Sequence, residues 1–246
     1  MTYPLYTSHA HLWSLISPLE SYESEMMEWC RLLQEHEIRE VLDLGSGGGH
    51  HLYHLVQGID SLESGVAVDL SVSMLAELHS LLPRFDTVAH DMTTLRLGRE
   101  FDLVSVHDSF CYLNTTEQVG RLFETVRLHL KSRGVALVKL DAVVDDFEGP
   151  YRYLTTFEDE KREVTLTHYE WDPKAGDGWL EVVYLFLERE RDAVTTREER
   201  HRLGLFSTDE LLRIAKVCGL SGSFHRLERW DEDRENLLLQ LEKTEG

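Results

Sequence analysis

The stretch VLDLGSGGG, residues 41–49, decides the fold. It runs from a short apolar segment into a cluster of glycines, and a helical pattern follows it over about 48–57. Glycines let the backbone turn sharply and let a ligand approach without meeting a Cβ atom. In open α/β sheets, ligands bind outside the carboxyl ends of the strands. The stretch therefore predicts a strand, a ligand-binding turn and a helix.

Apolar runs and helical patterns alternate from residue 41 onward, which indicates crossover units and a parallel sheet. The expected strands are 41–44, 65–70, 87–89, 101–106 and 135–140. The expected helices lie at about 48–57, 72–82, 116–130 and 207–218. Capping signals precede the last two, at Asn114/Glu117 and at Ser207/Glu210.

Residues 151–205 interrupt this alternation. Two β-rich runs, 164–171 and 180–189, flank a linker that is dense in turn-forming residues, and a third strand is expected at about 195–203. Segments 224–230 and 236–241 supply two more strands to the main sheet. We expect an α/β fold with a doubly wound, mostly parallel seven-stranded sheet (Rossmann-like) and an antiparallel β insertion after the fifth strand.

The N-terminal residues predict a helix over 17–36, with Ser17 as its cap and Pro18 and Glu20 as further start signals. Its apolar stripe either packs on the main domain or forms a lid, to which Trp13 and Tyr22 contribute. The resulting division of the chain is a helical lid at 1–37, a cofactor-binding core at 38–150, an acceptor cap at 151–205 and the end of the core sheet at 206–246.

Composition narrows the class of protein. A net charge of −20 over 246 residues opposes binding to nucleic acid, and the densest basic stretch, 197–202, is interrupted by two glutamates. The chain shows neither the basic start of a signal peptide nor an apolar stretch of bilayer length. Cys30, Cys111 and Cys218 are odd in number and widely spaced, which predicts reduced thiols in a cytoplasmic protein.

Two details of the turn favour S-adenosylmethionine over a dinucleotide. A dinucleotide fingerprint needs a small residue at its third glycine position, where this chain has His50. Asp43 precedes the turn, where a carboxylate suits an ammonium group and opposes a pyrophosphate.

Acidic residues follow the next two strands. Asp69 can accept hydrogen bonds from both ribose hydroxyls, although it would also serve as a helix cap. Asp91 can meet the exocyclic amine of an adenine, and Met92 can meet the face of the ring.

Segments in this order and spacing resemble the class I S-adenosylmethionine-dependent methyltransferases, over a core of about 38–141. The segments are Val41–Gly49, Val66–Leu70, His90–Met92, Phe101–Leu113 and Leu130–Leu140. His201–Ser207 resembles the segment that follows the insertion in this group. The insertion and the N-terminal helix resemble the small-molecule branch that includes amino-sugar N-methyltransferases.

The resemblance implies roles for particular residues. Gly45, Gly47 and Gly49 line the methionine and ribose, Asp43 lies near the amino group, Asp69 holds the ribose, and Asp91 and Met92 meet adenine. Ser46, Leu70 and His107 complete the expected cofactor set. The resemblance also implies one antiparallel strand near the edge of the sheet.

The loop after the fourth strand faces the expected methyl group. His107 could be a general base or a structural histidine, and Asp108 could orient it or pair with a cationic acceptor. Tyr112 is expected in the pocket wall, and Tyr151 and Tyr153 at the acceptor site.

No metal is expected. His50 and His54 lack a third ligand at matching spacing, and Ala142 stands where a magnesium site built on Asp108 and Asp141 would need an amide.

The favoured function is methyl transfer from S-adenosylmethionine to a small-molecule N or O acceptor by in-line displacement. An NAD-linked oxidoreductase on a similar fold and a non-catalytic cofactor-binding or interaction protein remain as alternatives. The expected partner is the small-molecule acceptor, with neither nucleic acid nor membrane, and a homodimer is left open.

Overall fold

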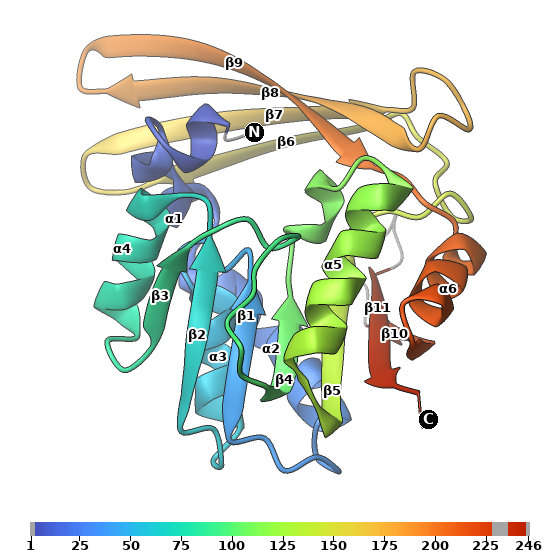
Figure 1. Cartoon of the computed structure of the whole chain (residues 1–246). Coiled ribbons are helices and arrows are strands. Elements are labelled where there is room, and N and C mark those ends of the chain that lie inside the picture. The colour runs from blue at the N-terminus through green and yellow to red at the C-terminus, as the bar shows by residue number, and fades with distance from the viewer. Residues whose placement is uncertain (1–2, 228–235, 245–246) are drawn as a thin grey trace.

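The computed structural model describes residues 3–227 and 236–244, which form two sheets and the helices around them. A seven-stranded sheet makes the body of the molecule, and a four-stranded sheet lies across the carboxyl ends of its parallel strands (Figure 1). No helix within the described ranges is both long enough and apolar enough to cross a bilayer.

The large sheet has the strand order β10-β11-β5-β4-β1-β2-β3. Its strands are β1 (Glu40–Leu44), β2 (Ser64–Asp69), β3 (Asp86–Ala89), β4 (Phe101–Val106), β5 (Leu130–Leu140), β10 (Leu220–Leu227) and β11 (Asn236–Lys243). Strands β1 to β5 pair in parallel, and β11 pairs antiparallel with both β5 and β10. The predicted seven-stranded sheet with one antiparallel strand near its edge is therefore confirmed. The expected strand at 224–230 starts earlier than predicted, and its residues 228–230 lie outside the described ranges.

Helices cover both faces of this sheet. They are α2 (Glu23–Leu32), α3 (His50–Gly58), α4 (Val72–Leu81), α5 (Thr116–His129) and α6 (Thr208–Val217). Side chains of α5 and α6 join one apolar core, and those of α2, α3 and α4 join the other. On α5, Val119, Leu122, Phe123 and Val126 recur at helical spacing and are all buried, so one face of the helix packs on the sheet.

Caps fix where the two later helices begin. The Ser207 hydroxyl accepts a hydrogen bond from the Glu210 amide at 3.2 Å, as predicted. The predicted cap of α5 at Asn114 is wrong by one residue. Thr115 and Gln118 form the capping box instead, because a glutamine at the third helical position completes the box as well as a glutamate does.

A single helix over 17–36 is also wrong. A 3₁₀ turn, η3 (Leu19–Tyr22), precedes α2, and Ser17 caps neither, since its hydroxyl lies 2.6 Å from that of Tyr22. Met26 and Trp29 are buried in the same core as α3, so α2 packs beside α3 against the large sheet.

The residues before η3 lie between the two sheets. They form η1 (Pro4–Tyr6), η2 (Ala10–Leu12) and the single turn α1 (Trp13–Ile16). Leu5 and Leu12 pack against Val164 and Phe186 of the small sheet. We call residues 3–16 the N-terminal strap.

The small sheet is the predicted antiparallel insertion, with four strands in sequence order. They are β6 (Tyr151–Glu158), β7 (Arg162–Trp171), β8 (Trp179–Glu190) and β9 (Ala193–Gly204). The predicted hairpin and third strand are β7, β8 and β9. Sequence reasoning missed β6, because this edge strand is exposed or half-buried throughout and lacks an apolar alternation.

Candidate active site

A cavity of about 460 Å³ opens at the carboxyl ends of the parallel strands, under the small sheet and the N-terminal strap. It lies beside β1 and β4, where successive crossovers of the doubly wound sheet turn to opposite sides, which is the usual ligand position in this architecture. The volume is typical of sites that enclose a small organic ligand.

The glycine-rich turn forms one wall of this cavity. Gly45 has a φ of +77°, and a Cβ atom there would lie 2.2 Å from the Ser109 side chain. Gly49 has a φ of +82°, and a Cβ atom there would lie 2.7 Å from Leu78. Both positions thus require glycine. Position 45 lies against the loop that follows β4, and position 49 lies against α4. Ser46 also lines the cavity, but its hydroxyl donates to the Asp43 carbonyl and accepts from the Val68 amide.

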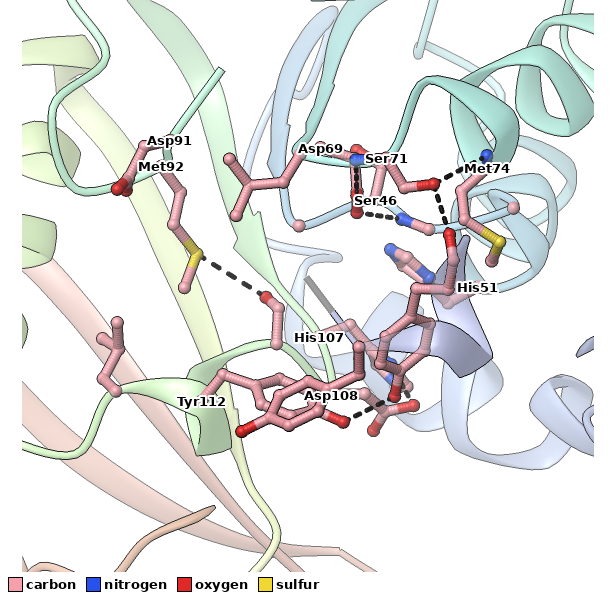
Figure 2. Close-up of a pocket in the computed structure, with 18 of the residues that line it drawn as sticks. Ser46, His51, Asp69, Ser71, Met74, Asp91, Met92, His107, Asp108 and Tyr112 are labelled. Carbon is pink, nitrogen blue, oxygen red and sulfur yellow. Dashed lines mark hydrogen bonds and ion pairs between the residues drawn. The ribbon is translucent and has the colours of Figure 1, made fainter. Parts of the chain in front are cut away.

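Asp69 ends β2 and lines the cavity beside this turn (Figure 2). Its carboxylate accepts the Gly47 amide at 2.9 Å and the Ser71 amide at 2.7 Å. Each oxygen can accept a further hydrogen bond, so two hydroxyls of a ligand can still be bound. Burial raises the pKa of Asp69 above its usual value, and the two amides partly offset this. Leu70, next in the chain, is half-exposed and adds an apolar contact.

Asp91 and Met92 lie on a separate wall (Figure 2). One oxygen of Asp91 accepts hydrogen bonds from the amide and hydroxyl of Thr93, both at 2.8 Å, which fixes the carboxylate. The Met92 sulfur lies 3.8 Å from the Ser109 hydroxyl, at the edge of the space that the glycine turn leaves open. A carboxylate and a thioether thus face the cavity together, as the sequence predicted.

Asp43 does not reach the cavity, and the expectation that it contacts the cofactor amino group is wrong for this structure. Its carboxylate is fully buried and lies 3.0 Å from His51 Nε2, and Ser105 donates to it at 2.6 Å. Strand side chains alternate in direction, and the side chain at 43 points toward α3 and β4. Asp43 therefore stabilises the glycine-rich turn through its contacts with His51 and Ser105, on the side away from the cavity.

His107 lines the cavity near Asp108 (Figure 2), and each of its ring nitrogens has a carboxylate neighbour. Nε2 lies 3.0 Å from Glu25, and Nδ1 lies 3.1 Å from Asp108. The ring is 2% exposed and stacks on His51 at 4.6 Å between ring centroids. Burial alone would lower the pKa of His107, but the two carboxylates raise it to about 9. At neutral pH this imidazole is therefore expected to be protonated, which argues against the general-base alternative and favours the structural one.

Lys139 completes this charged cluster. Its ammonium lies 2.7 Å from Asp108 and 3.1 Å from Glu25. Burial would raise the pKa of Glu25, but His107 and Lys139 lower it to about 2. Two cations and two carboxylates thus balance in one group, in which only the Asp108 side chain is substantially exposed, and we call it the floor cluster (Glu25, His107, Asp108, Lys139). Sequence reasoning missed Glu25 and Lys139, which come from α2 and β5.

Aromatic side chains form the remaining wall. Trp13, Tyr22 and Tyr112 line the cavity, as expected, and the strap adds Tyr3 and Tyr6. The hydroxyls of Tyr6 and Tyr112 are 2.7 Å apart. The aromatic run at residues 3–6 is the signal that could have identified this contribution, because exposed N-terminal residues rarely need two tyrosines.

Tyr151 and Tyr153, which were expected at the acceptor site, are not among the residues that line this cavity. They lie on β6, on the far edge of the small sheet from β9, and pack on each other with ring centroids 6.4 Å apart. The chain runs from the end of β5 to this distant edge strand before it returns to the cavity. Proximity in sequence to β5 therefore does not bring these two residues to the cavity lining.

His50 and His54 each form a hydrogen bond to the backbone of the segment that precedes α2. His50 Nδ1 lies 2.9 Å from the Ser17 carbonyl oxygen, and His54 Nε2 lies 2.9 Å from that of Leu19. Among the described residues, no group of three or more His, Cys, Asp or Glu side chains is placed to hold a metal ion. Asp141 lies near Lys139, at 3.9 Å, and away from the cavity lining.

Comparison with known proteins agrees with this geometry. The family described as "Methyltransferase domain" matches residues 41–134. A curated relative from Streptomyces fradiae, dTDP-3-amino-3,6-dideoxy-alpha-D-glucopyranose N,N-dimethyltransferase, is 28% identical over 211 residues, which cover 83% of this chain and 80% of the relative.

Solved structures share the whole fold. DesVI of Streptomyces venezuelae superposes with a TM-score of 0.81 at 22% identity, over 96% of this chain and 98% of its own. The amino pentose methyltransferase CalS10 of Micromonospora echinaspora, solved with S-adenosylmethionine bound, gives a TM-score of 0.75 at 19% identity, over 91% of this chain and 92% of its own. The family match covers the glycine turn and the parallel core, and together with these similarities it supports a methyltransferase that uses S-adenosylmethionine.

Proposed function

We propose that this enzyme methylates the amino group of a nucleotide-linked amino sugar. The observation that carries the proposal is the similarity to the Streptomyces fradiae N,N-dimethyltransferase, which extends beyond the cofactor core to most of the chain. The part of the cavity lined by tyrosines and tryptophan supports it, because flat aromatic faces pack well against sugar rings.

We also propose how the cavity holds S-adenosylmethionine. Asp69 accepts the two ribose hydroxyls, and Gly45, Gly47 and Gly49 let the backbone approach the ribose and methionine. Leu70 and Met92 contact the faces of the adenine ring, and Asp91 accepts its exocyclic amine. These residues fit the cofactor because all of them line one cavity and both carboxylates are already fixed by backbone amides.

S-adenosylmethionine supplies a methyl group on a positively charged sulfur, which an amine can displace in line. The protein therefore has to position the two reactants, and positioning alone can contribute about 7–11 kcal/mol to lowering the barrier. The floor cluster keeps the loop of Asp108 rigid beneath the cavity. The Asp108 carboxylate stays ionised, because burial would raise its pKa but His107 and Lys139 lower it strongly. Its negative charge favours a cationic sulfur or amine nearby.

The parts of the chain take distinct roles in this proposal. The core from 38 to 150 and the final strands hold the cofactor, and the small sheet and the N-terminal strap enclose the acceptor. The three cysteines are free thiols in the structure, which supports action in a reducing compartment such as the cytoplasm. Light scattering at micromolar concentration would decide between monomer and homodimer.

A pair of acceptors tests the function. We expect purified enzyme to release S-adenosylhomocysteine with dTDP-3-amino-3,6-dideoxyglucose, and mass spectrometry to show a gain of one or two methyl groups. The matched control, dTDP-6-deoxyglucose, carries a hydroxyl in place of the amine and should stay unmodified. Methylation of the hydroxyl sugar at a comparable rate would contradict N-methylation, and turnover of neither would refute the proposed acceptor class.

A further inference from the structure

A chain of hydrogen bonds leads from the cavity into the small sheet. The Tyr6 and Tyr112 hydroxyls, 2.7 Å apart, both line the cavity. The Tyr112 hydroxyl lies 3.1 Å from Nδ1 of His201, and Nε2 of His201 lies 3.3 Å from the Glu199 carboxylate. The other Glu199 oxygen lies 2.8 Å from His9. Residues from η1, from the 3₁₀ turn η4 (Phe110–Tyr112) and from β9 thus form one connected path.

The direction of each hydrogen bond follows from the chemistry of the groups. The Glu199 carboxylate can only accept, so Nε2 of His201 carries a hydrogen and donates it. In the neutral ring Nδ1 is then an acceptor, and the Tyr112 hydroxyl donates to it. Tyr112 has no second hydrogen, so Tyr6 donates to Tyr112. The Tyr6 oxygen is left with lone pairs that can accept a proton from a ligand in the cavity.

His201 is placed to receive such a proton. Its side chain is fully buried, whereas the path continues through Glu199 to His9, which is 24% exposed. Burial lowers the pKa of His201 from its usual value, and Glu199 only partly offsets this, so the ring is neutral near pH 7. Glu199 also accepts the Leu5 amide at 3.0 Å, which fixes its carboxylate.

Groups from every neighbouring element face His201. Tyr3 stacks on the ring at 3.7 Å between centroids, and Tyr184 meets it edge-on at 4.9 Å. His168 on β7 is a further titratable group, and its coulombic interaction with His201 lowers the pKa of His201. The remaining groups around the ring are those of the path itself, Tyr6, Tyr112 and Glu199.

We propose that His201 accepts the proton released by the acceptor amine, by way of Tyr6 and Tyr112, with Glu199 holding the ring. The inference rests on the proposed N-methyltransferase function, since an amine that is protonated in solution must lose a proton before it can attack. The ammonium N–H proton passes to the Tyr6 oxygen, the Tyr6 proton to Tyr112, and the Tyr112 proton to Nδ1 of His201. The products are a neutral amine and an imidazolium paired with Glu199, and the imidazolium returns its proton to solvent before the next turnover.

The test compares rate profiles between pH 6 and 9.5 for wild type and for His201→Gln, with dTDP-3-amino-3,6-dideoxyglucose as acceptor. General-base assistance contributes roughly 10²-fold or more, so we expect kcat of the variant to fall about 100-fold at pH 7. Near pH 9.5 the amine is neutral without help, and the deficit should nearly disappear. Cofactor affinity, measured by calorimetry, should not change.

His168→Gln is the matched control. His168 is a half-buried histidine on β7 that also pairs with a carboxylate, 3.0 Å from Glu170, and it does not line the cavity. It should keep the wild-type profile. Tyr112→Phe keeps the aromatic ring and breaks the path, so it should reproduce the His201→Gln profile. The double variant should be no slower than the slower single variant, because both changes interrupt one path.

The outcomes separate the two proposals. A wild-type enzyme that leaves the amino sugar unmethylated refutes the proposed function and this inference with it. Wild-type turnover with an unchanged profile in His201→Gln refutes only the inference. A deficit of equal size at every pH refutes it as well, because a merely structural defect does not vanish when the amine is already neutral.

Discussion

Replacing His107 with glutamine tests whether this histidine is a buried cation. The structure raises its pKa to about 9, against an ordinary value of about 6.5 in the unfolded chain. Between these values the folded protein holds one more proton than the unfolded protein, so the free energy of unfolding falls as the pH rises. The slope is about 1.4 kcal/mol per pH unit, and the total is about 3 kcal/mol. This contribution is fully present below pH 6.5 and lost above pH 9.

The assay is urea unfolding, followed by tryptophan fluorescence at half-unit steps from pH 6 to 9.5. His107→Gln removes the titrating group, and it should be less stable than wild type at pH 6 because Glu25 and Asp108 lose a cationic partner. The difference between the two curves should shrink by about 3 kcal/mol as the pH rises, since other titrating groups are common to both proteins. Parallel curves, or a midpoint near pH 6.5 for His107 in a proton NMR titration, would refute the reasoning and restore His107 as a candidate base.

Two further predictions concern the cofactor wall. Asp69→Ala should weaken S-adenosylmethionine binding by at least about 100-fold in calorimetry, because two charge-assisted hydrogen bonds are lost, while the melting temperature changes little; unchanged affinity would remove Asp69 from the ribose site. Gly49→Ala should lower the free energy of unfolding by about 2–4 kcal/mol, since it combines a left-handed φ with a Cβ atom 2.7 Å from Leu78. Gly48→Ala is its control, because a Cβ atom there lies no closer than 3.4 Å to its neighbours, and equal losses in the two variants would contradict the packing argument.

The large sheet could be predicted from sequence because its signals are local. The parallel strands other than the exposed β3 are mainly apolar runs, and Gly45, Gly47 and Gly49 adopt left-handed φ values that favour glycine. Asp69 and Asp91 could be placed for a similar reason, since a residue that directly follows a parallel strand must lie at the ligand-binding edge. Strand β6 has no comparable signal, because its side chains are exposed on one face and at most half-buried on the other.

The charged and aromatic parts of the site could not be predicted, because they depend on contacts between distant segments. The charged residues around His107 come from positions 25, 108 and 139. Only when the fold brings them together do the carboxylates raise the pKa of His107 far enough to favour a cation over a base. Asp43 was misplaced because its position in the sequence fits a cofactor contact equally well, and the direction of its side chain is decided by His51 and Ser105. Tyr6 and His201 are 195 positions apart, a separation that no local pattern spans.

The N-terminal strap touches both halves of the cavity. The Tyr6 carbonyl accepts the Ser71 hydroxyl at the start of α4, beside the proposed ribose site, while the Leu5 amide donates to Glu199 in the small sheet. The proposed sites for the methyl donor and for the acceptor therefore share this wall, and we expect the ligand that binds first to restrain it for the other. Thermodynamic linkage makes this effect reciprocal, so each ligand should raise the affinity for its partner by the same factor. A segment of 14 residues thus links the two binding events, in an enzyme whose reaction requires both ligands at once.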